Sequence, residues 1–135
     1  MNTNDNAINS AIAIADEIEQ WFTESKDWID ASMAERERLP DPDESKPEPL
    51  SILVRDDWRI PHTNARKSAV EYELLMTTGG PAARIVGDLN DYGDVTSATI
   101  QCQDWFTKWA TVALNEKQNE ALLAYAASFY FAENN

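Results

Sequence analysis

The chain has 135 residues, with 24 acidic and 11 basic side chains and a formal net charge of −13. This excess of carboxylates repels phosphate backbones and anionic lipids, which argues against direct binding to nucleic acid or membranes and favours a basic protein partner. The length and the 43% hydrophobic content fit one globular domain. The single cysteine excludes an intramolecular disulfide, and no signal peptide or apolar run of about 18 residues is visible, so we predict a cytoplasmic protein.

The first 39 residues predict one long amphipathic helix. Apolar residues recur at helical spacing from about residue 6 to residue 38, and Pro40 and Pro42 end the pattern. Such a helix would be roughly 50 Å long, which exceeds the width of the remaining body. Part of it therefore projects, or it breaks, or it pairs with a second copy in a homodimer. We predict that self-association would use the apolar stripe, at Ile8, Ala15, Ile18, Phe22 and Ile29.

The opposite face of this helix is almost entirely carboxylate. Between residues 5 and 35 there are eight acids and one base, Lys26, whereas a solvated helix face normally carries mixed signs. Side chains three and four residues apart are about 5–6 Å apart on a helix, similar to successive phosphates on a nucleic-acid strand. The face is a solvated surface, a nucleic-acid mimic or another kind of acidic interface. The predicted partner-binding acids are Asp16, Glu17, Glu24, Asp27, Asp30 and Glu37.

The remainder divides into a linker and a sheet-containing unit. Residues 40–50 hold four of the six prolines and predict a stiff, extended, acidic linker. Residues 51–135 predict an antiparallel sheet with a C-terminal helix, and residues 51–55 could add a short strand. The expected fold is therefore α+β, with a long N-terminal helix, a three- to four-stranded β-meander and a C-terminal helix, in one compact unit.

Two hairpins are specified by their pattern. Apolar residues alternate through residues 70–76, and Gly79-Gly80 then makes a two-residue turn. The first hairpin pairs Val70 with Leu89, Tyr72 with Gly87, Leu74 with Ile85 and Met76 with Ala83. The turn at residues 91–94 pairs Leu89 with Thr96, Gly87 with Ala98, Ile85 with Ile100 and Ala83 with Cys102. Every pair of the first hairpin is apolar or glycine, and the second again keeps one apolar face, which supports this register.

The last third is partly ambiguous. Residues 110–114 predict a fourth strand, although a helix from residue 105 onward fits as well. Asn115 and Gln118 resemble a capping box before a helix over residues 116–132. In that helix Leu122, Ala126, Phe129 and Tyr130 face inward, with Leu123 and Tyr125 flanking them.

No catalytic, metal or cofactor motif stands out. His62 is the only histidine, and a lone buried cysteine is more often a small hydrophobe than a nucleophile. Residues 77–81 lack a P-loop lysine, and Asp88, Asp91 and Asp94 lack the spacing of an EF-hand, so turns are the better interpretation. We therefore expect no enzymatic activity.

Aromatic residues crowd one turn near the end of the sheet. Trp105, Phe106 and Trp109 either cap the core or form a binding surface, because tryptophan is a frequent interface anchor. Trp105 and Trp109 are therefore partner-binding candidates.

Three segments resemble small proteins of phages and mobile elements: residues 72–85, 103–109 and 121–125. In its shortness and acidity the chain also resembles anti-CRISPR and anti-restriction inhibitors. The phage and mobile-element group has no assigned activity, so no functional residue is carried over from it. The acidic helix, together with the likeness to such inhibitors, predicts an inhibitor that binds a basic nucleic-acid-binding surface of a host defence complex in the host cytoplasm. The alternative is a homo-oligomeric adaptor, or a protein that sequesters a small ligand, using the Gly79-Gly80 turn and the Trp105/Trp109 loop.

Overall fold

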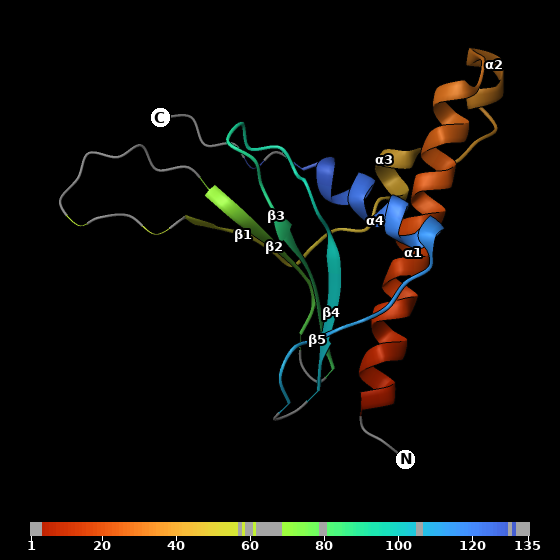
Figure 1. Ribbon diagram of the computed structural model, residues 1–135. Helices are drawn as coiled ribbons and strands as arrows, with labels where there is room; N and C mark the ends of the chain where they lie inside the picture. The colour runs from red at the N-terminus through yellow and green to blue at the C-terminus, as the bar shows by residue number, and fades with distance from the viewer. Residues whose placement is uncertain are drawn as a thin grey trace.

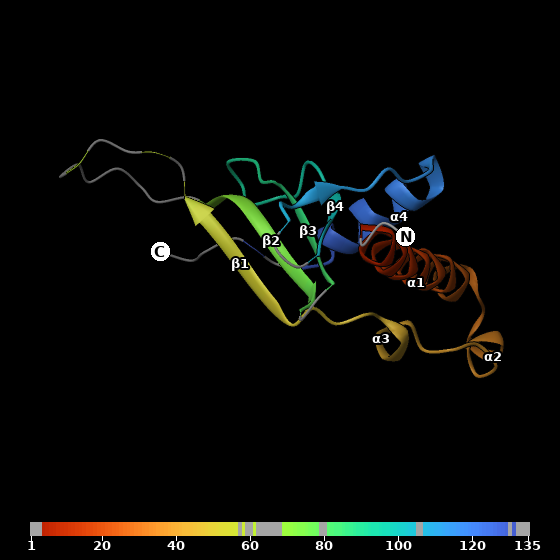
Figure 2. The ribbon, with the colours of Figure 1, turned by 90° about the horizontal axis from the view of Figure 1, so that it is seen from below.

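The computed structural model describes residues 4–56, 58, 61, 69–78, 81–104, 107–129 and 131. A long helix, α1 (Asn4–Asp30), and a C-terminal helix, α4 (Glu116–Ala127), pack on a five-stranded antiparallel sheet. Both helices lie on the same side of the sheet, and the other side is open (Figures 1 and 2). The α+β prediction is confirmed, with five strands in place of the three or four expected.

The strands follow one another in space as they do in the chain. They are β1 (Ser51–Asp56), β2 (Ala69–Thr77), β3 (Ala82–Asp88), β4 (Thr99–Gln103) and β5 (Ala110–Thr111). The predicted pairs Leu74 with Ile85 and Ile85 with Ile100 are confirmed, as are Tyr72 with Gly87 and Ala83 with Cys102. Pairing by alternation works here because one face of each strand is buried and a slip of one residue would expose it.

The register is wrong at two predicted positions. Ala83 pairs with Thr77 instead of Met76, because the ladder shifts by one residue after Leu75. Leu89 bridges Val95 instead of Thr96. There the Asn90 carboxamide accepts hydrogen bonds from two backbone amides of the turn and closes it one residue early. The Gly79-Gly80 turn lies outside the described residues.

The core lies between the sheet and the two helices. Leu74, Ile85 and Ile100 from the sheet meet Ile18 of α1 and Leu122 of α4, and all five side chains are fully buried. Each contributes about 1.5–3 kcal/mol by leaving water. The helices do not cover the outer strand β1, where Ile52 is 48% and Leu53 is 56% exposed.

The N-terminal helix ends earlier than predicted. It stops at Asp30, and a separate single turn, α2 (Met33–Arg36), follows. Ser32 causes the break: its backbone is extended and its hydroxyl accepts a hydrogen bond from the Glu35 amide, which makes it the N-cap of α2. Arg36 then donates to the carbonyls of Trp28 and Ile29 at the end of α1.

The predicted linker is also partly helical. Residues 42–45 form one turn, α3 (Pro42–Ser45), with Asp41 as its N-cap and proline at its first position. The Trp21 indole donates to the Pro42 carbonyl over 3.1 Å, and the Tyr125 hydroxyl donates to the Pro47 carbonyl. The segment is therefore held against α1 and α4 and does not extend freely.

The C-terminal part settles the strand-or-helix question within the described residues. Ala110 and Thr111 form the edge strand β5, which is shorter than the predicted 110–114. The capping box of Asn115 and Gln118 is present, and α4 ends at Ala127 instead of residue 132. Tyr125, expected to flank the helix, is fully buried, and Tyr130 lies outside the described residues.

Candidate functional surfaces

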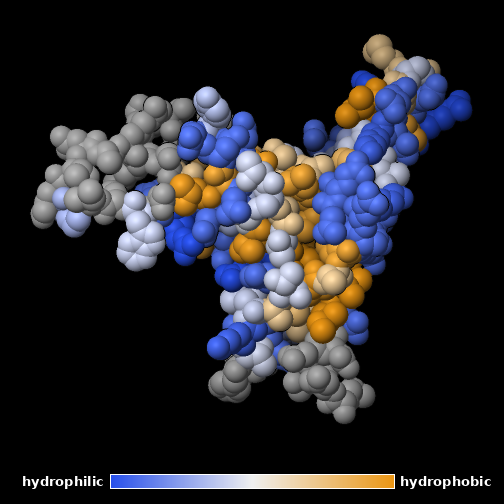
Figure 3. All heavy atoms as spheres, in the orientation of Figure 1, coloured by the Kyte–Doolittle hydropathy of each residue, from blue (hydrophilic) through white to orange (hydrophobic). Residues whose placement is uncertain are grey.

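The predicted acidic residues lie on two different helices. Asp16, Glu17, Asp27 and Asp30 are exposed on the outward side of α1, and Glu24 beside them is half-buried. We call these five residues the acidic face. In Figure 3 hydrophilic residues cover much of the middle and the far end of α1, whereas its N-terminal part is largely hydrophobic in this view. Glu37 is exposed but caps the end of α2, beyond the break, so it does not continue the row.

The described basic residues do not neutralise the acidic face. The ion pairs that involve α1 lie along its seam with α4, where Lys117 meets Glu19 at 3.4 Å and Lys26 meets Glu120 at 3.5 Å. The five carboxylates of the acidic face form no ion pair in the part of the chain that the structure describes. Their two hydrogen bonds to side chains come from neutral amides, Gln118 to Asp16 and Gln20 to Glu24. Their charge is therefore available to a partner.

The far end of α1 carries apolar groups among these acids. Ile29 is 71% and Met33 is 86% exposed, and both lie where α1 and α2 project beyond the sheet (Figure 1). Arg36 holds this end together, because it stacks at 5.5 Å on the Trp28 ring as well as capping the α1 carbonyls.

The predicted self-association stripe is mostly used inside the protein. Ala15 and Ile18 are buried, and Phe22 packs against the core. Ala15 and Ile18 are therefore not accessible to a second copy, and Phe22 is only partly so, because the sheet and α4 cover the middle of α1. Ile8 and Ile29, at the two ends of the stripe, remain exposed.

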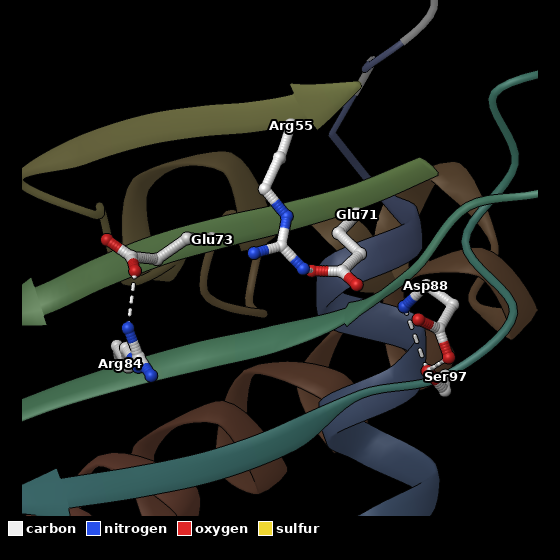
Figure 4. Close-up of polar contacts among 6 residues, drawn as sticks. All are labelled: Arg55, Glu71, Glu73, Arg84, Asp88 and Ser97. Carbon is white, nitrogen blue, oxygen red and sulfur yellow. Dashed lines mark hydrogen bonds and ion pairs between the residues drawn. The ribbon is translucent and has the colours of Figure 1, made fainter. Parts of the chain in front are cut away.

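The open face of the sheet forms a pocket that the sequence did not indicate. It measures about 720 Å³ and is lined by all five strands. Glu73 accepts from Arg84 over 2.8 Å, and Arg84 also donates to the Gln101 carboxamide over 2.9 Å. Arg55 pairs with Glu71 nearby, as Figure 4 shows. The signal was present in the charged residues that alternate with the apolar ones on β2 and β3.

Trp109 belongs to this open face and not to the core. The guanidinium of Arg84 lies 4.2 Å from the centre of its ring, and the indole is half-buried. Trp109 therefore does not cap the described core, and its role in partner binding stays a prediction. Trp105 and Phe106 lie outside the described residues.

The cysteine and the turn acids that the sequence named as possible reactive residues have ordinary structural roles. Cys102 is buried in the core, and this burial raises the pKa of its thiol, which disfavours a thiolate. The carboxylate of Asp88 accepts from the Ser97 hydroxyl, and Gly93, at φ 82°, completes the turn between Asp91 and Asp94. Across the described ranges, no three potential ligands gather to hold a metal ion. His62 lies outside them.

No protein-family model, curated protein or solved structure matches this chain. The resemblance to small phage and mobile-element proteins therefore stays a prediction. No helix in the described segments is long and apolar enough to cross a membrane.

Proposed function

We propose that this protein is a non-enzymatic inhibitor that binds the basic nucleic-acid-binding surface of a host defence complex through the acidic face of α1. The observation that carries the proposal is the set of five outward carboxylates without a cationic partner among the described residues. A face that only keeps a protein soluble works equally well with mixed signs, whereas this one offers a single sign to a partner.

The spacing along the helix supports mimicry of a phosphate backbone. Glu24, Asp27 and Asp30 follow one another at intervals of three residues, which is one charge per about 4.5 Å of helix axis. A single strand of duplex DNA carries one charge per about 3.4 Å of its axis. A basic channel that accepts a phosphate row can therefore meet a comparable density of negative charge on α1.

The charge of the protein predicts how binding to the partner should respond to salt and to nucleic acid. The net charge of −13 attracts a cationic surface over a distance of about one Debye length, so association should be fast and should weaken as salt rises. Nucleic acid should compete for the same surface. The resemblance to phage proteins and anti-CRISPR inhibitors supports the choice of a defence complex as the target.

A charge-reversed variant tests the proposal. The immobilised protein is exposed to nuclease-treated host lysate and then eluted with duplex DNA or with salt. Captured proteins that DNA displaces are expected with the wild type and not with the variant Asp16→Lys, Glu24→Lys, Asp27→Lys and Asp30→Lys. Single reversals should do little, because one exposed ion pair is worth about 0–1 kcal/mol.

The matched control reverses four exposed acids elsewhere, at Glu35, Glu44, Asp91 and Asp94, and changes the net charge equally. It should still capture the partner that DNA displaces. Equal loss of capture in both variants would mean that total charge decides. Unaltered capture by the first variant would end the mimicry proposal.

The second candidate, a small-ligand-sequestering protein, is favoured by the pocket on the open sheet face. Its volume of about 720 Å³ is within the usual range for small-molecule sites, and Arg84 and Glu73 give it charged groups. Trp109 does not line the pocket but stacks on Arg84, which does. Trp109→Ala should impair this function and leave the DNA-displaced capture intact, so the two candidates separate in one experiment.

A further inference from the structure

Three aromatic rings enclose the ammonium group of Lys46. Its Nζ lies 4.2 Å from the ring centre of Phe129, 5.7 Å from that of Trp21 and 5.9 Å from that of Tyr125. The rings stand edge-on to one another, with centres 5.6 Å apart for Trp21 and Tyr125 and 5.1 Å apart for Tyr125 and Phe129. They form three walls around one position, which we call the aromatic cage.

Two helices and the turn after α4 supply the three rings of the cage. Trp21 comes from the middle of α1, Tyr125 from the buried side of α4, and Phe129 from the turn directly after α4. The negative faces of aromatic rings attract cations, and aromatic cages of this kind recognise alkylated ammonium groups in preference to neutral ones. The carboxylates of Asp43 and Glu48 lie close enough to act on Lys46 and Tyr125, respectively, and add to the attraction for a cation.

The occupant is a poor match for this environment. A primary ammonium group is strongly hydrated, and burial in the cage lowers the pKa of Lys46, against the smaller opposing influence of Asp43. A methylated ammonium group carries less tightly bound water and would lose less on entering the same position.

Lys46 is brought to the cage by a short strap, residues 41–48. The strap is fixed by the hydrogen bonds of Trp21 to Pro42 and of Tyr125 to Pro47, so two cage residues also hold its backbone. Lys46 is the only base between residues 40 and 50. The strap is otherwise acidic and lies against an acidic helix (Figure 1), so like charges oppose its docking and Lys46 offsets them.

We propose that the cage is a binding site for alkylammonium groups, which Lys46 fills within the chain and which a methylated lysine side chain fills when the strap moves aside. Glu17 and Glu24 lie four residues before and three residues after Trp21, so this wall of the cage borders the acidic face. A basic segment bound there would pass beside the cage. The proposal stands on the cage geometry and does not depend on the inhibitor function.

The test uses two defined probes, the tetramethylammonium ion and a short peptide with one trimethyllysine, and NMR of the Trp21 indole N–H. Lys46→Ala empties the cage, and saturable shifts are expected at concentrations at least about tenfold lower than for the wild type. The matched control is Lys26→Ala, which removes the same charge from beside one described ring, because Lys26 lies 4.3 Å from the Phe22 ring centre and pairs with Glu120 at the surface. It should bind like the wild type.

Adding Phe129→Leu to Lys46→Ala should abolish the shifts while the far-ultraviolet circular dichroism stays unchanged. A folded Lys46→Ala variant without saturable shifts would overturn the proposal, as would equal affinities of the wild type and Lys46→Ala, because Lys46 would then not be the occupant. Tighter binding of the peptide than of the free ion assigns the ligand to a protein partner, and equal binding assigns it to a small quaternary amine.

Discussion

Gly87 occupies a position where even one added carbon would meet the backbone. A Cβ atom there would lie 1.9 Å from the carbonyl oxygen of Ser97 and 2.7 Å from the hydroxyl oxygen of Tyr72. The same hydroxyl donates a hydrogen bond of 2.7 Å to that carbonyl. Gly87→Ala must therefore push apart β3, the segment before β4 and the tip of Tyr72.

The cost follows from two parts. Forcing an additional carbon into a packed site costs typically 1–3 kcal/mol, so about that much is expected from displacement of the Ser97 backbone. The Tyr72 side chain is buried, and leaving its hydroxyl without a partner costs about 1–3 kcal/mol more. The sum is roughly 4 kcal/mol, which is a large part of the roughly 5–15 kcal/mol that stabilises a domain.

Urea denaturation of four proteins measures this: the wild type, Gly87→Ala, Tyr72→Phe and the double variant. Tyr72→Phe alone should cost about 1 kcal/mol. It should cost less in the Gly87→Ala background, because the hydrogen bond is already displaced there. Gly93→Ala is the comparison, since its strain at φ 82° costs about 1–2 kcal/mol. A loss below 1 kcal/mol for Gly87→Ala, or a smaller loss than for Gly93→Ala, would refute this account of the packing.

Two further predictions concern pH and capping. Burial raises the pKa of Tyr72 and Tyr125 above 10.0. The neutral tyrosines therefore stabilise the folded protein fully below pH 10. Above pH 10 the free energy of unfolding falls by up to about 1.4 kcal/mol per pH unit for each tyrosine. Lys46, whose pKa is lowered in the folded protein, partly opposes this fall. Urea denaturation between about pH 9 and pH 11.5 should show this fall, and a double Tyr→Phe variant with an unchanged slope would contradict it. Asn115→Ala removes the N-cap of α4 and should cost about 1 kcal/mol, seen as a fall of a few degrees in Tm; Lys117→Ala in the same turn should change Tm less, and equal effects would argue against the cap.

The sheet could be predicted because its information is local. Each hairpin has a turn of a definite length, and the apolar residues on either side of it alternate, so Leu74, Ile85 and Ile100 can be aligned without knowing anything else about the fold. The errors at Met76 and Leu89 arose where a backbone irregularity or a side-chain bond to the turn displaced the ladder by one residue.

The end of α1 could not be predicted from periodicity. Apolar spacing continues through Ile29, and Ser32 is an ordinary residue inside a helix as well as a good N-cap. Ser32 acts as an N-cap here because the Arg36 side chain donates hydrogen bonds to the carbonyls at the end of α1, which stabilises the helix end. A hydrogen bond between a side chain and backbone groups seven or eight residues earlier does not appear in the spacing of apolar residues.

The candidate sites were predictable to different extents. The acidic face follows directly from the count of charges on one side of a helix. The aromatic cage does not, because Trp21, Lys46 and Tyr125 are far apart in the sequence and meet only when α4 packs on α1 and residues 41–48 cover both. The prolines in that segment predicted an extended linker, so its contacts with Trp21 and Tyr125 were not expected.

The position of the acids on α1 decides whether the fourfold lysine variant should lose stability as well as partner binding. Asp27 and Asp30 lie in the last turn of α1, which has no basic residue. The carboxyl end of a helix carries a partial negative charge, so each acid there costs about 0.3–1 kcal/mol, and a lysine would gain a similar amount. Asp27 and Asp30 thus oppose the stability of their own helix and form no ion pair with the described residues in return. Asp16 and Glu24 each accept one exposed side-chain hydrogen bond, from Gln118 and Gln20, respectively. We therefore expect the fourfold lysine variant to melt no lower than the wild type. If it does so and no longer captures a partner that DNA displaces, the loss cannot be attributed to unfolding. If it melts lower, these carboxylates contribute to the fold, and the argument that they serve binding loses its physical basis.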